Sequence, residues 1–394
     1  MNTFELKNEQ RIYFGLNPVN KNWDRVEFPK GLVCYFSDNI IEKVIIFSQK
    51  NPNNYTEFDT KIPTNNRTKL IPKTEKGKEK TITPTTVIDY NLSFSSFNII
   101  ISKNKENEQN IAYFDCIIGN QKLDIQNNTD SFKNLNSLSE FEKAANNFIA
   151  TLSDNHLEQI EKLKLKKEER TKPVRFKSGD FFAVPVKFDL YGNPTEYNFG
   201  RHLLNIADLR KKGIVENGHH WNTLMTVVQL VKLYDFNSNS LEQDLKKLKT
   251  QHALPTFHMM DNSLMRGGYP IIGNIPLEIH ELTFPMHYGR YIDQRSGYFF
   301  GWGICMLDNV KEIPKRNTTR FNNNGVSSGS DQWSLKKYRD GESPYSESEI
   351  EHPQNKDLKN EIFKNLGVDP GIDYDEFCNK FGFKNRAELL KLAK

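Results

Sequence analysis

The sequence predicts an α+β protein with several domains, and three observations lead to this prediction. The chain has 394 residues, which is more than a single hydrophobic core usually serves. Short runs rich in Ile, Val, Phe and Tyr alternate with clusters of Asn, Pro and Gly, as in β-sheets. Other stretches carry apolar residues at helical spacing. We therefore expect an N-terminal β-rich domain, linking helices, a central α+β domain with a mainly antiparallel sheet, and a small helical C-terminal cap.

Changes in composition along the chain predict where these parts begin and end. Residues 1–135 form the β-rich domain, whose role the sequence does not indicate, and residues 136–173 form a helical linker. Residues 174–312 form the central α+β domain. Residues 313–356 are rich in Asn, Ser, Gly and acidic residues, which predicts a polar and partly mobile connection. Residues 357–394 form the helical C-terminal segment.

The N-terminal domain contains five candidate strands separated by turn-forming residues. A basic segment at 61–80, with seven Lys or Arg residues and two Glu residues, lies between them. Such a segment could contact phosphate, but loops of this kind are usually solvated, and we interpret it as an exposed hairpin tip. The candidate strands are residues 11–16, 32–36, 44–47, 97–102 and 111–118.

The linker is predicted to hold two helices. Ser137 and Glu140 have the spacing of a capping box, and apolar residues at helical spacing follow them. The second run, 157–170, has a narrow apolar stripe among Glu and Lys residues, which is typical of an exposed connecting helix. Pro173 ends this run, so we expect the main domain boundary between residues 155 and 173.

Residues 176–201 are the stretch around which the central domain is predicted to form. An apolar strand, a turn at 191–194 and a return strand together predict a β-hairpin. An almost continuously apolar segment at 223–236 is the candidate central strand. The aromatic run 298–302 could be a platform for stacking bases, but its composition favours a core strand. Predicted helices are 203–212, 241–248 with Ser240 as its cap, 358–366, 374–381 and 386–393.

No catalytic motif survives inspection of its context. The G-x-S-x-G match at 325–329 lies in a polar loop, without the strand and helix that a nucleophile elbow requires. His219 and His220 are adjacent, and on a strand they would face opposite sides. His258 could approach one of them, so a metal-dependent enzyme with a site near these three histidines remains an alternative. We predict no catalytic residue, no metal ligand and no cofactor.

Charge and cysteine usage limit the classes of partner. The net charge is only +4, so a protein that coats nucleic acid uniformly is excluded, and nucleic acid is not the expected partner. No apolar run is long enough to cross a membrane, so we expect a cytoplasmic protein with no membrane partner. The single cysteines Cys34, Cys116, Cys305 and Cys378 predict reduced and mostly buried thiols.

Four pieces of the central domain, in the same order, resemble the immunity protein 26 family. The first is a Gly-Asp-hydrophobic-Phe pattern closed by a proline, and the second is a strand that ends in an aromatic residue and Gly-Arg. An apolar strand with an aromatic residue and Asp follows, and then a Pro-Ile-Ile-Gly stretch in which Tyr269 stands where the family has Trp. The resemblance covers residues 174–307. Its signature residues, which we expect to be structural, are Gly179, Asp180, Phe182, Pro185, Phe199, Gly200, Pro270 and Gly273.

The resemblance implies a small α+β immunity protein from a bacterial polymorphic toxin system. Such a protein is made beside a secreted toxin, binds the toxin domain, often a nuclease, and needs no catalytic residues or cofactor. The alternative is a nucleic-acid-binding or general interaction module. We expect exposed aromatic residues and an acidic tail cluster to contact the toxin. The candidates are Trp221, Trp333, Asp340, Glu342, Glu347, Glu349 and Glu351.

Overall fold

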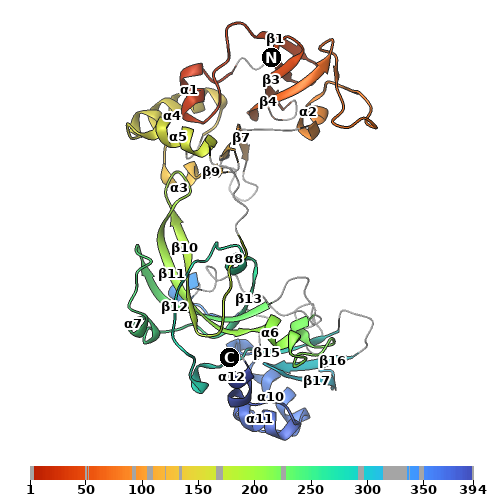
Figure 1. The fold of residues 1–394 in the computed structure, drawn as a ribbon, viewed down its shortest axis with the longest axis vertical. Helices are drawn as coiled ribbons and strands as arrows, with labels where there is room; N and C mark the ends of the chain where they lie inside the picture. The colour runs from red at the N-terminus through yellow and green to blue at the C-terminus, as the bar shows by residue number, and fades with distance from the viewer. Residues whose placement is uncertain are drawn as a thin grey trace. The chain divides into compact units, whose positions relative to one another are not determined.

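The computed structural model is α+β, as predicted (Figure 1). It divides into two compact units. Unit 1 comprises Met1–Glu169 and Phe188–Asn193, and unit 2 comprises Arg170–Lys187 and Pro194–Lys394. The structure describes residues 4–48, 51, 53–90, 95–103, 110–119, 121–132, 135–165, 172–222, 228–291, 297–313, 335–336, 338–345 and 350–392.

Unit 1 is built on one antiparallel sheet in the order β1-β2-β3-β4-β7-β8-β9, with β5 and β6 branching from β4. Alternate residues of a strand face opposite sides, and here both sides are covered by apolar groups. Val33 and Tyr35 belong to one core cluster, while Leu32 and Phe36 belong to the other. The strands are β1 (Asp24–Phe28), β2 (Leu32–Ser37), β3 (Ile40–Phe47), β4 (Tyr55–Asn65), β5 (Lys69–Leu70), β6 (Lys80–Thr81), β7 (Ser95–Lys103), β8 (Asn110–Ile118) and β9 (Gln121–Leu123).

The helices of unit 1 correct two predictions. Residues 11–16 were expected to form a strand, but residues 8–13 form a helix, whose start is capped by the Gln10 side chain accepting from Lys7 N at 2.9 Å. The second linker helix was expected to be exposed, yet it buries Ile160 and Leu163 in the unit 1 core. The cap at Ser137 is confirmed, since its Oγ accepts a hydrogen bond from the backbone N–H of Glu140 at 3.3 Å. The helices are α1 (Asn8–Tyr13), α2 (Pro84–Tyr90), α3 (Ile125–Asn128), α4 (Leu138–Thr151) and α5 (His156–Leu165).

Unit 2 contains two antiparallel sheets. The five-stranded sheet has the order β13-β12-β11-β10-β14, and the three-stranded sheet has the order β15-β16-β17. The predicted hairpin is present as β10 and β11, and Asp189 Oδ1 accepts hydrogen bonds from two backbone N–H groups in its turn. The strands are β10 (Asp180–Phe188), β11 (Pro194–Asn205), β12 (Val228–Ser238), β13 (Phe257–Met260), β14 (Ile271–Asn274), β15 (Met286–Arg290), β16 (Tyr298–Trp302) and β17 (Cys305–Val310).

Two short helices of unit 2 begin later than predicted. Strand β11 continues to Asn205, whose side chain caps α6 by accepting from Ala207 N. Asp244, and not Ser240, caps α7, because its carboxylate accepts the first free N–H groups of that helix. The short helices are α6 (Ile206–Lys211), η1 (His220–Asn222), α7 (Leu245–Lys249), α8 (Asn262–Met265), η2 (Ile279–Glu281) and η5 (Pro353–Asn355).

Three C-terminal helices pack against the three-stranded sheet in one large core cluster. The whole of β16 is buried, so the aromatic run is a core strand and not an open stacking platform. Its Phe300 and Trp302 rings lie 5.7 and 5.3 Å from the ring of Phe377, which is itself fully buried. None of the described helices has the length and apolar content needed to span a lipid bilayer. The C-terminal helices are α10 (Lys356–Asn365), α11 (Tyr374–Phe381) and α12 (Arg386–Leu392).

Candidate functional site

The glycines of the family signature permit close packing in the five-stranded sheet. Gly179 has a φ of 86°, and a Cβ there would collide with the carbonyl oxygen of Ile275. A Cβ at Gly200 would collide with the ring of Phe182. Any larger residue would therefore push β10 away from its neighbours.

The other signature residues join β10 to the loop before β14. Asp180 accepts hydrogen bonds from Lys177 N and from Asn274 Nδ2, both at 2.7 Å. The carbonyl of Pro270 accepts a hydrogen bond from Ala183 N at 3.0 Å. Tyr269 stacks on Phe182 with ring centroids 6.2 Å apart. These contacts hold strands together and present no reactive group. Pro185 and Phe199 are also buried, and the Cβ of a residue at Gly273 would meet Leu245.

Arg201, which follows the signature glycine, is the centre of a buried charge cluster. It is fully buried, and its Nη1 lies 3.0 Å from Oε1 of Glu281. Its Nη2 donates to the carbonyl oxygens of Ile275 and Pro276 at 2.9 and 3.2 Å. The guanidinium also lies over the Phe181 ring, 4.7 Å from its centroid. Burying this cation is tolerable because a carboxylate, two carbonyls and an aromatic face surround it.

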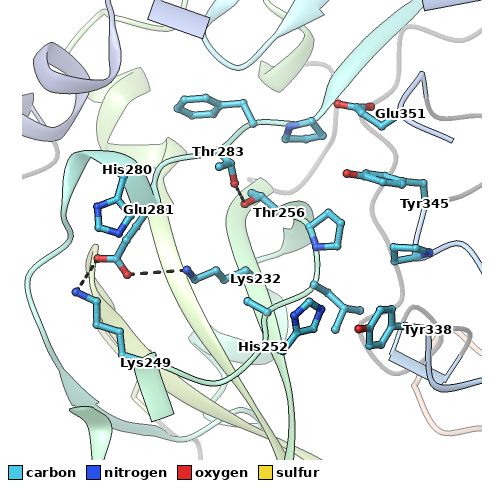
Figure 2. A pocket seen from close by; sticks show the side chains of 16 residues that line it. Lys232, Lys249, His252, Thr256, His280, Glu281, Thr283, Tyr338, Tyr345 and Glu351 are labelled. Atoms are coloured by element: carbon cyan, nitrogen blue, oxygen red, sulfur yellow. Dashed lines mark hydrogen bonds and ion pairs between the residues drawn. The ribbon is translucent and has the colours of Figure 1, made fainter. Parts of the chain in front are cut away.

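Two lysines share the carboxylate of Glu281 with Arg201 (Figure 2). Lys249 Nζ lies 3.4 Å from Glu281 Oε2 and also contacts Glu278. Lys232 Nζ lies 3.9 Å from Glu281 Oε1, beyond hydrogen-bond distance. Among the described residues, the ammonium of Lys232 has no hydrogen-bond acceptor, although its side chain is only 16% exposed.

The pKa values of the two lysines differ in direction. Burial lowers the pKa of Lys232, and the nearby charges of Arg201 and Lys249 add to this effect while Glu281 opposes it. The hydrogen bond to Glu278 raises the pKa of Lys249. Another negative charge beside Lys232 would therefore favour its charged form.

The charge cluster forms part of the wall of a cavity of about 570 Å³ in unit 2. Figure 2 shows Lys232 between Glu281 on one side and the hydroxyls of Thr256 and Thr283, which are hydrogen-bonded to each other, on the other. Tyr338 and Tyr345 lie on the opposite wall. The cavity therefore combines cations, hydroxyls and aromatic faces, a lining suited to a polar side chain or short segment of a partner.

The wall opposite Lys232 comes from the polar tail, which includes the predicted acidic cluster. Tyr338 stacks on His252 with centroids 5.2 Å apart, and Arg339 Nε donates to Asp235 Oδ1 at 2.6 Å. Glu351, which lines the cavity, accepts a hydrogen bond from Met286 N at 2.8 Å. Asp340 and Glu342 are exposed nearby in the chain, and Trp333, Glu347 and Glu349 lie outside the described residues.

The expectation that Trp221 is exposed is wrong. Its side chain is 1% exposed, and its Nε1 donates a hydrogen bond to His258 Nε2 at 2.9 Å. Trp221 lies in the helical turn η1, and its ring packs inward in the core cluster that also contains Ile206 and Leu209 of α6. Trp221 is a core residue in this structure.

The histidines of the alternative enzyme site do converge, but as packed rings. The His219 and His220 rings stack with centroids 4.2 Å apart, since they lie in a turn and not on a strand. The ring of His287, a residue that no sequence pattern singles out, lies 5.3 Å from the ring of His258 and 5.7 Å from that of His220. A Cβ at Gly301 would lie 2.7 Å from Nδ1 of His220, so the glycine makes room for the cluster.

Burial keeps these histidines neutral. It lowers the pKa of His219 and of His287 to about 4, and the pKa values of His220 and His258 lie well below the usual 6.5. Within the described part of the chain, no three His, Cys, Asp or Glu side chains are placed to hold a metal ion. The cluster therefore resembles polar core packing more than a reactive centre.

The comparison with protein families agrees with the resemblance found in the sequence. Residues 177–300, from the approach to β10 into β16, match the model of the family described as Immunity protein 26. No curated protein and no solved structure matches the chain. The suspected resemblance to the immunity protein 26 family is thus confirmed over residues 177–300 of the chain.

Proposed function

We propose that this chain is an immunity protein that binds and neutralises a bacterial toxin domain without catalysing a reaction. The family match over residues 177–300 carries this proposal. The matched residues form the five-stranded sheet, and the signature positions within it are occupied by packing and turn residues. A protein that acts by occupying a toxin needs a stable surface and no reactive group, which fits this arrangement.

The cavity of unit 2 is our proposed point of contact with the toxin. Lys232 is nearly enclosed and has room beside it for a negatively charged acceptor. A carboxylate side chain of the toxin that entered the cavity would pair with this ammonium, whose side chain is only 16% exposed. Such charge-assisted hydrogen bonds are stronger than exposed ones.

The acidic residues of the tail are proposed to act at the rim. Asp340 and Glu342 are exposed, and they lie in the chain between Tyr338 and Tyr345, which line the cavity. Basic residues around the active site of a nuclease toxin would be attracted to these carboxylates and would associate faster. A nuclease is therefore the toxin class that we propose.

Calorimetric titration of the purified chain against the toxin domain encoded beside it tests the proposal. We expect a dissociation constant in the nanomolar range, roughly −12 kcal/mol, together with rescue of growth in cells that express the toxin. A Gly200→Leu variant, which should not pack β10 against β11, is the matched negative control. A folded wild-type chain that neither binds nor rescues would contradict the immunity role and leave the family match as a likeness of fold.

A further inference from the structure

Two of the four cysteines lie against each other in the core of unit 2. Cys305 is the first residue of β17 and Cys378 lies within α11. Both are fully buried, and their Sγ atoms are 2.8 Å apart. Cys34 and Cys116 are also buried but have no sulfur partner among the described residues. The sequence predicted four isolated thiols, and the fold pairs two of them across 73 positions of chain (378 minus 305).

The surrounding residues hold the two sulfurs in place. The Tyr374 hydroxyl accepts a hydrogen bond from Ile304 N at 3.3 Å, next to Cys305. This approach requires Gly303, which has a φ of 60° and at which a Cβ would lie 2.7 Å from the hydroxyl oxygen. Aromatic contacts of Trp302 with Tyr374 and Phe377 fix the helix against the sheet on the same side. The sulfurs therefore meet between two elements that are already packed together.

The two thiols differ in acidity. The hydrogen bond from Cys305 lowers the pKa of Cys378, with support from the Tyr374 hydroxyl and the charge of Arg386 against the effect of burial. The same contact and burial raise the pKa of Cys305. Cys378 is thus the thiol that reaches the thiolate form more readily, and the thiolate is the nucleophile in disulfide exchange. No third metal-ligating side chain joins the pair in the described part of the chain.

We propose that Cys305 and Cys378 form a redox-modification site, in which a disulfide locks α11 onto the three-stranded sheet. The oxidant is a small disulfide of the glutathione class. The Cys378 thiolate attacks one sulfur of the oxidant and expels its other half as a thiolate. The Cys305 thiolate then attacks the sulfur of Cys378 in this mixed disulfide and releases the second half. The two cysteines lose two protons and two electrons, and the oxidant becomes two thiols.

The lock would act on a part of the chain outside the family match. Both cysteines follow residue 300, and the closed loop contains the polar tail with the exposed Asp340 and Glu342. Bond formation needs the sulfurs to move closer by less than about 1 Å. Because both are buried, exchange proceeds through local opening of α11. A cross-link of this span restricts the unfolded chain and so stabilises the packed state.

Incubating the purified full chain with oxidised glutathione, close to its melting temperature so that α11 opens, tests the proposal. Alkylation in denaturant followed by mass spectrometry should count two free thiols in place of four and find peptides 305 and 378 linked. The Tm should rise by roughly 5–10 °C and fall again with dithiothreitol. Four alkylated thiols, glutathione adducts alone or a link through another cysteine would overturn the proposal.

Matched variants distinguish the effect of the Cys305–Cys378 disulfide from other effects of oxidation. Cys34→Ala and Cys116→Ala remove buried single thiols and should keep the full Tm shift. Cys305→Ala and Cys378→Ala should each abolish the Tm shift. Cys378→Ala should leave three alkylated thiols, whereas Cys305→Ala should trap the mixed disulfide on Cys378 and leave two. If Cys378→Ala does not fold, the Tm of Cys305→Ala still tests the proposal, because the disulfide requires both sulfurs. A shift that survives in Cys305→Ala would contradict the assignment.

Discussion

Each unit buries a network of charged side chains. The two networks differ in the ratio of cations to carboxylates and in whether they open into a cavity. In unit 1, two cations meet two carboxylates. Arg11 Nε lies 2.7 Å from Glu57 Oε1, and Lys43 Nζ lies 2.9 Å from Glu57 and 2.5 Å from Asp59. The backbone N–H of Asn17 also donates to Asp59. Burial alone would raise the pKa of Glu57, but Lys43 and Arg11 outweigh it and the pKa is lowered.

In unit 2, three cations surround one nearly buried carboxylate, and one side of the network opens into a cavity. Glu278 pairs with Lys249 at the exposed end, but Lys232 has only a contact with Glu281 at 3.9 Å and the face of the Tyr234 ring at 5.7 Å. A closed and balanced network such as that of unit 1 serves the fold. An open network with an unsatisfied cation is able to accept a charge from outside, and this difference is why we place partner binding in unit 2.

Breaking the network of unit 1 should have the largest effect. Glu57→Gln leaves Lys43 and Arg11 buried with one fewer negative charge, and we expect a loss of about 3–5 kcal/mol in the free energy of unfolding. Urea denaturation followed by circular dichroism measures it. Lys69→Met, which removes only an exposed pair with Glu79, is the control and should cost less than about 1 kcal/mol. Equal stability of Glu57→Gln and the wild type would show that the network is dispensable.

Acid should destabilise unit 2 through its buried histidines. His219 is charged more easily when unfolded than when folded, where its pKa is about 4. Its neutral packing therefore stabilises the fold fully above pH 6.5, and this contribution is lost as pH falls toward 4. For one such group we expect about 2 kcal/mol of stability lost between pH 7 and pH 5. Denaturant midpoints at the two pH values measure this, and His219→Gln should reduce the difference. A wild-type denaturation midpoint that does not change with pH would exclude this contribution of His219 to stability.

Removing the ammonium of Lys232 in unit 2 should affect toxin binding more than stability. Lys232→Met should change the free energy of unfolding by less than about 1 kcal/mol, since its ammonium has no hydrogen-bond acceptor among the described residues, but should weaken toxin binding by about 10-fold or more. Titration calorimetry and urea denaturation together measure the two effects. Lys211→Met is the control, because that side chain is 78% exposed and pairs only loosely with Asp208. Full affinity in Lys232→Met would move the contact away from the cavity.

Reversing the acidic rim should give the smallest effect. Asp340→Lys combined with Glu342→Lys should slow association with the toxin by about 2–10-fold and flatten its dependence on salt, while dissociation changes little. Stopped-flow or surface-plasmon kinetics at several ionic strengths measure both rates. Glu361→Lys, an exposed acid on α10, is the control. Unchanged association kinetics in the double variant would remove these two residues from the proposed contact.

Local patterns predicted much of the secondary structure. The hairpin was visible because apolar runs flank a turn with Gly192 and Asn193, and the cap at Ser137 was visible because its partner lies three residues away. The helix at residues 8–13 was missed because Ile12, Tyr13 and Phe14 favour a strand locally. Within this helix, Arg11 pairs with Glu57, which lies 46 residues away, and no local pattern indicates that contact.

The candidate site could not be predicted because its parts are brought together only by the fold. Arg201, Lys232, Lys249 and Glu281 come from β11, β12, α7 and η2 and share no spacing motif. The sequence does not distinguish a nearly buried lysine with no hydrogen-bond acceptor from a lysine that is solvated. The cysteine pair was hidden for the same reason, since single cysteines separated by many residues give no sign of contact.

The division of the chain also limits how this protein can be taken apart or recombined. The chain passes from one unit to the other three times, after residues 169, 187 and 193. The short return segment contributes Tyr191, whose hydroxyl is hydrogen-bonded to His156, and Leu190, whose carbonyl accepts from Asp124 N in unit 1. A proteolytic cut after residue 169 would leave residues 188–193, which belong to unit 1, attached to unit 2, and deleting residues 1–169 would remove the neighbours of that segment. A gene rearrangement that exchanged the N-terminal unit would have to preserve the tip of the hairpin as well.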